Sequence, residues 1–379
     1  MAKENYDWFP LTVVLGKAFC NRTEERHIVK QYVNNGRHTV LMAPRRYGKT
    51  SLIHQVLHEM KVPHTVVELT LATCFEDVQR MLIDHVSGLL YSILPKASKA
   101  KQNILSLFSW LRPEIVLGIG KQKLIFHPEV EKQNPIDSVS KLLKKLNDAA
   151  QLVGKRVVIV LDEFQQLNEM EDHTLEAAIR HAMQYATHVS YLFSGSNRRM
   201  LQSMFNDKNR PFYNSCEVIH LDRISRKDYQ SFIQHAAHDV WEKSIPQEAL
   251  EELFLLTEFH PNYINRICGH FWLTKEFPTE KRVLEYWKAY VVSKGAEFTR
   301  ELLRLSKNQR KVLAFFAEHP AKHTSSHEVC MRVALPEASV RQAVKALFAD
   351  DYLYKDQEGV TRVLDPAIRD FIKNLSSLS

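Results

Sequence analysis

Short apolar runs alternate with amphipathic stretches along the first 221 residues. Helical spacing of apolar positions is clearest at Lys49–Met60, Phe75–Ile93 and Ile136–Val153. Continuous apolar strands separated by helices are typical of a parallel sheet that is covered on both faces, so we predict an α/β fold with such a sheet. An inserted hairpin is expected at Pro113–Phe126, turning near Gly120. The predicted strands are Thr39–Met42, His64–Leu71, Arg156–Leu161, Val189–Phe193 and Cys216–Leu221.

The pattern changes after about residue 225. Residues 226–292 read as all-helical, with Ser225 and Ser244 as expected helix caps. From about residue 305, three helical stretches precede two short strands, which is the element order of a winged helix. These five elements are Lys307–His319, Glu328–Val333, Ser339–Ala349, Tyr352–Tyr354 and Val360–Leu364. We therefore expect an α/β core at 1–225 with an insert at about 110–135, a helical domain at 226–304 and a winged helix at 305–379.

Composition excludes several classes of protein. Apolar residues make up 45% and charged residues 25% of the 379 positions, as in ordinary globular chains. No run approaches the roughly 18 apolar residues of a membrane span, and residues 1–10 lack the apolar stretch of a signal peptide. The five cysteines form no CxxC pair, which argues against a zinc site or a disulfide framework. A cytoplasmic location is therefore expected, and the net charge of +7 is compatible with a polyanionic partner.

The sharpest motif is APRRYGKT at residues 43–50, which follows a predicted strand and opens a predicted helix. It is the Walker A pattern except that Ala43 replaces the first glycine. Backbone N–H groups from Tyr47 to Ser51 would surround a β-phosphate, and Lys49 would neutralise the β- and γ-phosphates of ATP. The Thr50 hydroxyl would bind Mg²⁺; the alternative is a chance GKT at a helix start. The expected nucleotide contacts in this segment are Pro44, Arg45, Arg46, Tyr47, Gly48, Lys49, Thr50 and Ser51.

A second motif lies about 110 residues later, where Val157–Leu161 runs into Asp162 and Glu163. Apolar residues that end in Asp-Glu form a Walker B pattern. Asp162 would hold Mg²⁺, and Glu163 would act as the general base toward the attacking water. The alternative is a strand that ends in two solvated acids.

Polar residues also follow the strand Val189–Phe193. Ser196 or Asn197 could hydrogen-bond the attacking water, and Arg198 could reach the γ-phosphate. The alternative is that Ser196 and Asn197 only end the strand and that the arginines are solvated.

These segments together resemble the archaeal-type ATPase branch of the STAND and AAA+ P-loop NTPases. The resemblance covers Phe19 to about Gly269 and rests on APRRYGKTSL, VVIVLDEFQQL and LFSGSNRRML, with a lead-in at 19–25 and the segment Glu258–Tyr263. It implies a Mg²⁺-dependent ATPase that works as a molecular switch, with a helical lid at 226–304. The lead-in, with Phe19 and Arg22, would contact adenine, and the turn at His260 and Pro261 would close over the nucleotide.

The chain departs from the family at Ala43 and at His260, where related members often carry glycine. Arg22 has the alternative of a surface salt bridge to Glu24 or Glu25, and Pro261 that of a simple helix breaker.

Two surfaces suggest partners. The third helix of the winged helix would expose Arg341, Gln342 and Lys345 to DNA, but residues 305–379 hold 11 Lys/Arg and 9 Asp/Glu, a weak basic footprint. Packing against the core or a protein partner is the favoured alternative. Arg210 follows the predicted helix Met200–Phe205, where AAA+-like ATPases place an arginine that reaches a neighbour's γ-phosphate. Its alternative is a local pair with Asp207 or a cap on the preceding helix.

The leading hypothesis is therefore an ATP-dependent switch with slow hydrolysis, acting through a protein partner or a homo-oligomer. A nucleic-acid-binding ATPase of the origin-recognition or transposition-helper kind is the second. A nucleotide-binding scaffold without turnover is the third.

Overall fold

The computed structural model describes residues 6–118, 121–126, 135–170, 173–356 and 358–376. The chain forms two compact units. The first, here called the core unit, is Arg22–Leu221. The second, the helical unit, combines residues 1–21 with 222–379.

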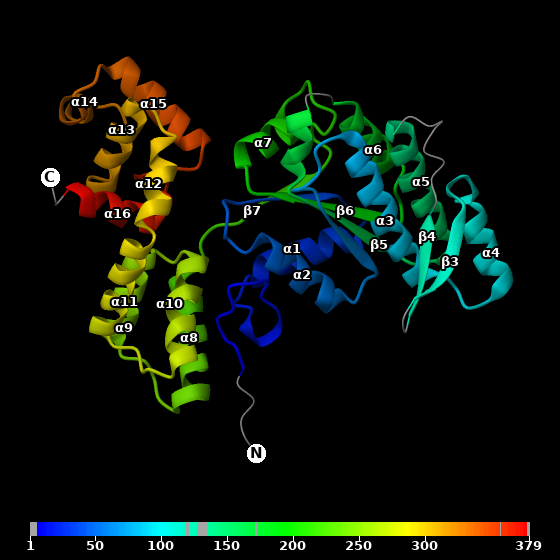
Figure 1. The fold of residues 1–379 in the computed structure, drawn as a ribbon, viewed down its shortest axis with the longest axis horizontal. Helices are drawn as coiled ribbons and strands as arrows, with labels where there is room; N and C mark the ends of the chain where they lie inside the picture. The colour runs from blue at the N-terminus through cyan, green and yellow to red at the C-terminus, as the bar shows by residue number, and fades with distance from the viewer. Residues whose placement is uncertain (1–5, 119–120, 127–134, 171–172, 357, 377–379) are drawn as a thin grey trace. The chain divides into compact units, whose positions relative to one another are not determined.

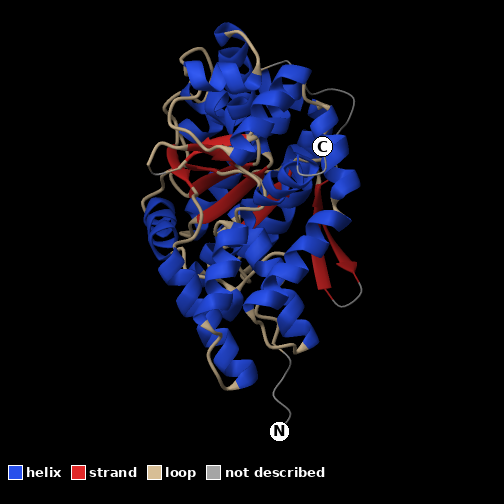
Figure 2. Ribbon diagram, turned by 90° about the vertical axis from the view of Figure 1, so that its left-hand side faces the viewer, coloured by secondary structure: helices blue, strands red, loops and turns tan. Residues whose placement is uncertain are grey.

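The core unit is built on a five-stranded parallel sheet in the order β2-β5-β6-β1-β7, which confirms the predicted α/β fold. Every residue of β1, β5 and β6 is buried, as their continuous apolar sequences require. Figure 2 shows these strands among the helices that cover them. The strands are β1 (Thr39–Met42), β2 (His64–Glu68), β5 (Val157–Asp162), β6 (Val189–Gly195) and β7 (Glu217–His220).

Side chains alternate between the two faces of this sheet. On one face, residues such as Ile159 and Tyr191 pack in one apolar cluster with α3 (Phe75–Ile93), α5 (Pro135–Val153) and α6 (Thr174–Gln184). On the other face, the Ser190 hydroxyl donates to the Val33 carbonyl of α1. The remaining helices of the unit are α1 (Thr23–Asn34), α2 (Lys49–Met60), α4 (Ser98–Ser106), α7 (Arg198–Asn206), η2 (Ser109–Leu111) and η3 (Phe164–Met170).

The insert contains the predicted hairpin. Strands β3 (Pro113–Gly118) and β4 (Lys121–Phe126) pair antiparallel and form a sheet of their own. The Phe108 and Phe126 rings stack with centroids 5.3 Å apart, which fixes β4 to the segment that precedes η2. The expected turn at Gly120 lies outside the described residues.

After residue 221 the helical unit continues with five helices, α8 to α12. The predicted cap of the first, Ser225, accepts a hydrogen bond from the backbone N–H of Asp228. Ser244 is not a cap, because Pro246 precedes α9 and the Ser244 hydroxyl contacts His238 instead. The helices are α8 (Arg226–Trp241), α9 (Gln247–Thr257), α10 (Pro261–Thr274), α11 (Glu280–Ser293) and α12 (Gly295–Leu303).

Residues 6–21, expected in the core, pack on these helices instead. They include the short helix η1 (Gly16–Ala18). The Trp8 indole donates to Asp239 of α8, and the Phe9 ring lies 4.7 Å from that of Trp272 on α10. Burial of these two aromatic side chains accounts for the placement.

The C-terminal segment has the predicted helix–helix–helix–hairpin order of a winged helix (Figure 1). Its first helix starts with a capping box formed by Ser306 and Gln309. Within the described ranges, no helix is long and apolar enough to cross a membrane. The elements are α13 (Lys307–Glu318), α14 (His327–Val333), α15 (Glu337–Ala349), β8 (Leu353–Lys355), β9 (Thr361–Val363) and α16 (Pro366–Ser376).

Candidate nucleotide site

Strand order brings the predicted motifs to one edge of the core sheet. Strand β6 lies between β1 and β5, and all three run parallel. Met42 pairs with Gly195, and Leu161 pairs with Phe193. The residues that follow β1, β5 and β6 therefore meet at the carboxyl edge, which is where ligands bind in open parallel sheets.

The loop between β1 and α2 has the backbone that phosphate binding needs. Arg46 and Gly48 both have left-handed angles, with φ of 65° and 84°. A Cβ at Gly48 would meet nothing within 4 Å, so the angle rather than space calls for glycine there. The turn directs the chain into α2 at Lys49, so the first backbone N–H groups of the helix face the loop.

The substitution at Ala43 is tolerated for a simple reason. Ala43 is fully buried and does not have a positive φ, so a side chain at this position causes no backbone strain. The Lys49 ammonium folds over the loop and donates to the carbonyls of Ala43 (3.0 Å) and Pro44 (3.1 Å). Lys49 is only 6% exposed, so the loop encloses a positive charge where the phosphates would lie.

Two oxygen ligands suited to Mg²⁺ meet beside the loop. The Thr50 hydroxyl donates to Asp162 Oδ2 at 3.1 Å, and Ser194 donates to Asp162 Oδ1 at 2.5 Å. A hydroxyl and a carboxylate are hard oxygen donors, and Mg²⁺ usually takes one or two such protein ligands with phosphate oxygens and water completing the shell. Thr50 and Asp162 therefore fit the metal, and Ser194 orients the carboxylate.

Glu163 lies next to this pair and is held by several hydrogen bonds. Its Oε2 accepts from the Ser196 hydroxyl (2.8 Å), the Ser196 backbone N–H (3.2 Å) and the Gln165 amide. Burial acts to raise the pKa of Glu163, but these hydrogen bonds and the charge of Lys49 outweigh it and lower the pKa below its ordinary value. The carboxylate is thus ionised and aimed at the end of β6.

Gln165 reaches Glu163 only because residue 195 is glycine. A Cβ at Gly195 would lie 1.9 Å from Gln165 Oε1. Glu163 itself has a left-handed φ of 52°, which turns the chain from β5 into η3 and brings Gln165 back over the strand end.

Of the two residues considered for contact with the attacking water, Ser196 contacts Glu163. Asn197 is exposed and caps α7, since its Oδ1 accepts from the Met200 backbone N–H at 3.1 Å. Arg198 is half-buried in the first turn of α7, and Arg45 Nε lies 3.4 Å from the Ser196 hydroxyl. The roles of Asn197 and Arg198 toward a phosphate stay predictions.

Arg22, the residue before α1, holds the loop between β1 and α2 in place. Its guanidinium donates to the Tyr47 carbonyl (3.3 Å) and pairs with Glu25 (2.8 Å). The salt bridge to Glu25 that was the alternative for Arg22 is therefore observed, as a partly buried pair in which Arg22 is 6% and Glu25 25% exposed. Contact of Arg22 with adenine stays a prediction.

The other two residues expected at the nucleotide, Phe19 and Pro261, belong to the helical unit. Pro261 occupies the first turn of α10, where its missing N–H costs nothing. His260 has a φ of −70° and needs no glycine, because the left-handed angles of this turn fall on Glu258 and Phe259. The expected closure of the turn over the nucleotide stays a prediction.

Arg210 is enclosed within its own chain. Its guanidinium donates to Asn168 Oδ1 (2.8 Å) and to Glu176 Oε1 (2.5 Å), and its side chain is 9% exposed. The local alternative of a pair with Asp207 is not observed either, since only the backbone N–H of Arg210 bonds the Asp207 carbonyl.

Two further residues that contact the site, Ser194 and Gln165, were absent from the sequence prediction. Ser194 is a fully buried polar side chain at the end of an apolar strand, and Gln165 lies two residues after Glu163. Each was visible as a polar residue beside a motif, but their contacts depend on the pairing of β5 with β6.

The chain matches no protein-family model and no curated protein. Among solved structures it is similar to a Walker-type ATPase of Pyrococcus abyssi, with a TM-score of 0.69 and 18% identity over 97% of this chain and 99% of that one. This likeness shows that the chain has the fold of a Walker-type ATPase. ORC2 of Aeropyrum pernix (TM-score 0.49, 13% identity, 99% of both chains) and a RuvB Holliday junction branch migration motor of Thermotoga maritima (0.43, 15%, 98% and 99%) are too distant to carry an argument.

Proposed function

We propose that this chain binds ATP with Mg²⁺ at the loop before α2 and hydrolyses it. The observation that carries the proposal is the convergence of four side chains at one sheet edge. The Thr50 hydroxyl contacts Asp162, Asp162 is followed directly by Glu163, and the Lys49 charge lies close enough to lower the pKa of Glu163. This is the set of groups that phosphoryl transfer to water requires.

Each residue of the site would have its own role in hydrolysis. Backbone N–H groups of the loop and Lys49 bind and neutralise the phosphates, and Asp162 and Thr50 hold the cation. Mg²⁺, when bound, offsets negative charge on the phosphate oxygens. Glu163 accepts the proton of the attacking water, and Ser196 holds the Glu163 carboxylate in place.

Substitution of the general base tests this proposal. Glu163→Gln keeps the shape of the side chain but cannot take a proton, so ATP turnover should fall by ~10²–10⁴-fold while ATP binding persists. Glu24→Gln, at an exposed position of α1, is the matched control and should leave turnover unchanged. Equal turnover in wild type and Glu163→Gln would contradict the proposal.

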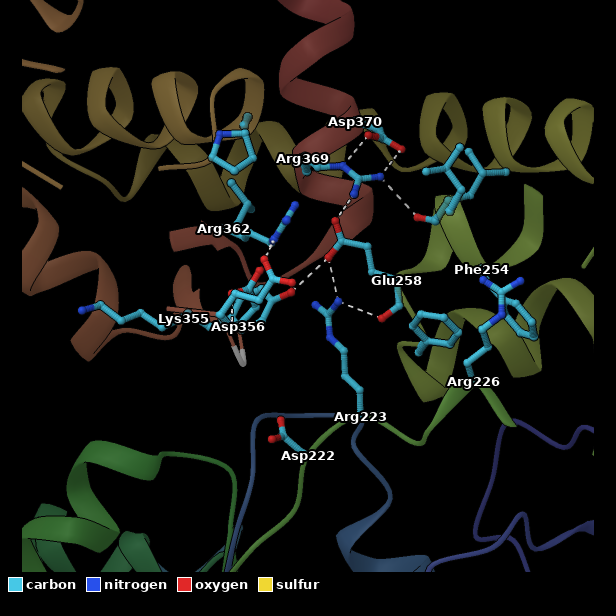
Figure 3. A pocket seen from close by; sticks show the side chains of 18 of the residues that line it. Asp222, Arg223, Arg226, Phe254, Glu258, Lys355, Asp356, Arg362, Arg369 and Asp370 are labelled. Atoms are coloured by element: carbon cyan, nitrogen blue, oxygen red, sulfur yellow. Dashed lines mark hydrogen bonds and ion pairs between the residues drawn. The ribbon is translucent and has the colours of Figure 1, made fainter. Parts of the chain in front are cut away.

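We further infer that the nucleotide state is passed to the helical unit, with output through a protein partner or self-assembly. Arg223, two residues into the helical unit, donates to the Glu258 carboxylate (2.6 Å) and to the Leu364 carbonyl after β9 (2.8 Å). Arg369 of α16 also pairs with Glu258 (Figure 3). Glu258 therefore ties the segment that leaves the core to both the lid helices and the winged helix, as a switch would need.

A DNA-binding ATPase is the second candidate, favoured by one observation. Arg341, Gln342 and Lys345 are all exposed on α15, as the DNA hypothesis requires. Arg341 pairs with Glu337, however, which reduces the positive charge of this face. Duplex affinity that falls with salt and in the double variant Arg341→Ala, Lys345→Ala would support this candidate.

A further inference from the structure

The loop that carries Arg210 contacts η3, the 3₁₀ segment that starts directly after Glu163, at two points. At the near end, the Phe212 ring lies 5.3 Å from that of Phe164, the first residue of η3. Four residues farther along η3, the Arg210 guanidinium donates to Asn168. A segment held at two points four residues apart has little freedom, and Gln165, which holds the Glu163 carboxylate, lies between them.

The charge of Arg210 is compensated inside the same chain. Glu176, at the start of α6, is fully buried and pairs with Arg210. A guanidinium that reached a neighbouring protomer would leave the buried Glu176 carboxylate with only the imidazole of His173, 3.5 Å away, in place of its charged partner, and the loss of that charge is unfavourable. Asn168 would lose its donor in the same movement.

We propose that Arg210 acts within its own chain as a positioning residue: with Asn168 and Glu176 it clasps η3 and thereby fixes Gln165 and Glu163 for hydrolysis. This inference rests on the proposed ATPase function. It replaces the expected reach of Arg210 into a neighbour's site with a cis role. Arg210 touches neither ATP nor water in this role, and its effect passes through η3.

Three substitutions test this arrangement of Arg210, Asn168 and Glu176 around η3, which we call the clasp. Asn168→Ala removes the contact to η3 and leaves the buried ion pair intact, whereas Glu176→Gln and Arg210→Ala break the pair. All three should lower the kcat for ATP, by up to about 10²-fold as expected when a reacting group is slightly misplaced, while the Kd for ATP stays unchanged. The loss in a double variant Asn168→Ala, Arg210→Ala should be less than additive, because both changes remove the same hydrogen bond.

The Glu176→Gln variant separates the cis role from action across an interface. If Arg210 works in a neighbouring site, weakening its own-chain pair should leave kcat unchanged or raise it, which would overturn the clasp. Mixing Arg210→Ala chains with Glu163→Gln chains gives a second readout. The clasp predicts no recovery of turnover, because each chain lacks a working site of its own, and recovery would overturn it.

Folding and the wider proposal are checked in the same experiment. Thermal unfolding of each variant identifies changes that only destabilise the chain, and Asn168→Ala, which keeps the ion pair, remains decisive if Arg210→Ala does not fold. Wild-type turnover equal to that of Glu163→Gln would overturn the ATPase proposal itself. Inactive Glu163→Gln alongside fully active Asn168→Ala and Glu176→Gln would overturn the clasp alone.

Discussion

At the scale of single residues, the chemistry depends on how the Glu163 carboxylate is held. Hydrogen bonds from Gln165 and Ser196 offset the effect of burial and lower the pKa of Glu163. Three hydrogen-bond donors contact one oxygen of this carboxylate. The carboxylate is therefore oriented as well as charged. Changes that loosen these contacts should therefore affect turnover more than ATP binding.

Gly195→Ala makes such a change without touching a charged group. The new Cβ would lie 1.9 Å from Gln165 Oε1, so Gln165 must move away from Glu163. We expect kcat to fall, by up to about 10²-fold for a misplacement near 1 Å, with little change in ATP affinity. Steady-state kinetics with calorimetry measure both quantities.

The matched control is Gly88→Ala, in the exposed face of α3, where an added Cβ meets nothing within 4 Å. Alanine is the better helix former there, so this variant should be at least as stable as wild type and fully active. Normal turnover in Gly195→Ala would show that Gln165 does not control Glu163.

At the scale of elements, α1 and α2 are joined by one acid that three side chains share. Glu59 of α2 accepts from Arg26 of α1 (2.5 Å) and from Gln55 (2.6 Å), and it pairs with Lys30. Partial burial acts to raise its pKa, but these contacts lower it from 4.5 to about 2. The pair of helices that carries the phosphate loop is therefore stabilised by an ionised Glu59.

The sign of the pH dependence follows from this lowered pKa. An acid whose pKa is lower in the folded state stabilises the fold above its unfolded pKa, and the contribution disappears as pH falls through the folded value. Glu59 should therefore add stability above about pH 4.5 that is lost between pH 4.5 and about 2. Glu59→Gln should unfold at lower denaturant than wild type at pH 7, and the difference should shrink toward pH 3. A constant difference across this range would contradict the assignment.

Most elements were predictable because their periodicity is local. The bounds of α2 and α3 agree with the prediction to the residue, since amphipathic spacing and flanking breakers define them. The placement of residues 6–21 was not predictable, because burial of Trp8 and Phe9 depends on helices more than 200 residues away. Long-range packing of this kind leaves no periodic signal in the sequence.

In the candidate site, too, some contacts were predictable from the sequence and others were not. Lys49, Thr50, Asp162 and Glu163 stand in contiguous motifs, so their proximity follows from the carboxyl edge of a parallel sheet. The contacts of Gln165 and of Arg210 depend on which strands are neighbours and on the path of a loop. Sequence patterns specify neither, and the expected direction of Arg210 accordingly differs from its observed pair with Glu176.

At the scale of the whole molecule, Glu258 is one of the residues that connect the helices of the helical unit with its C-terminal segment. It lies beside a cavity of about 1050 Å³ that is lined by residues of α8, α9 and the C-terminal segment (Figure 3). The Tyr354 hydroxyl of β8 also donates to Glu258, at 3.3 Å. Its left-handed backbone, with φ of 46°, places it in the turn before Pro261. A movement of this turn would therefore change the contacts that Glu258 makes with the winged helix.

Glu258→Gln should loosen that connection. Loss of the carboxylate charge leaves Arg223 and Arg369 without their shared partner, so hydrogen exchange should accelerate in β8, β9 and the start of α16. The difference in exchange between ATP-bound and ADP-bound protein should also diminish in these elements. Glu251→Gln, which breaks an exposed pair between Glu251 of α9 and Arg226 of α8, is the control. Unchanged exchange in Glu258→Gln would contradict a role of this residue in the proposed switch.

The central claim is that the loop before α2 is an ATP site, and calorimetric titration of ATP into wild type and Lys49→Ala in the presence of Mg²⁺ tests it most directly. Lys49 is the buried cation of that loop, and its contacts with the Ala43 and Pro44 carbonyls also shape the loop itself. The account predicts saturable binding to wild type and no measurable binding to the variant, with both proteins showing a cooperative thermal unfolding transition. Equal ATP affinity in the two proteins would contradict it.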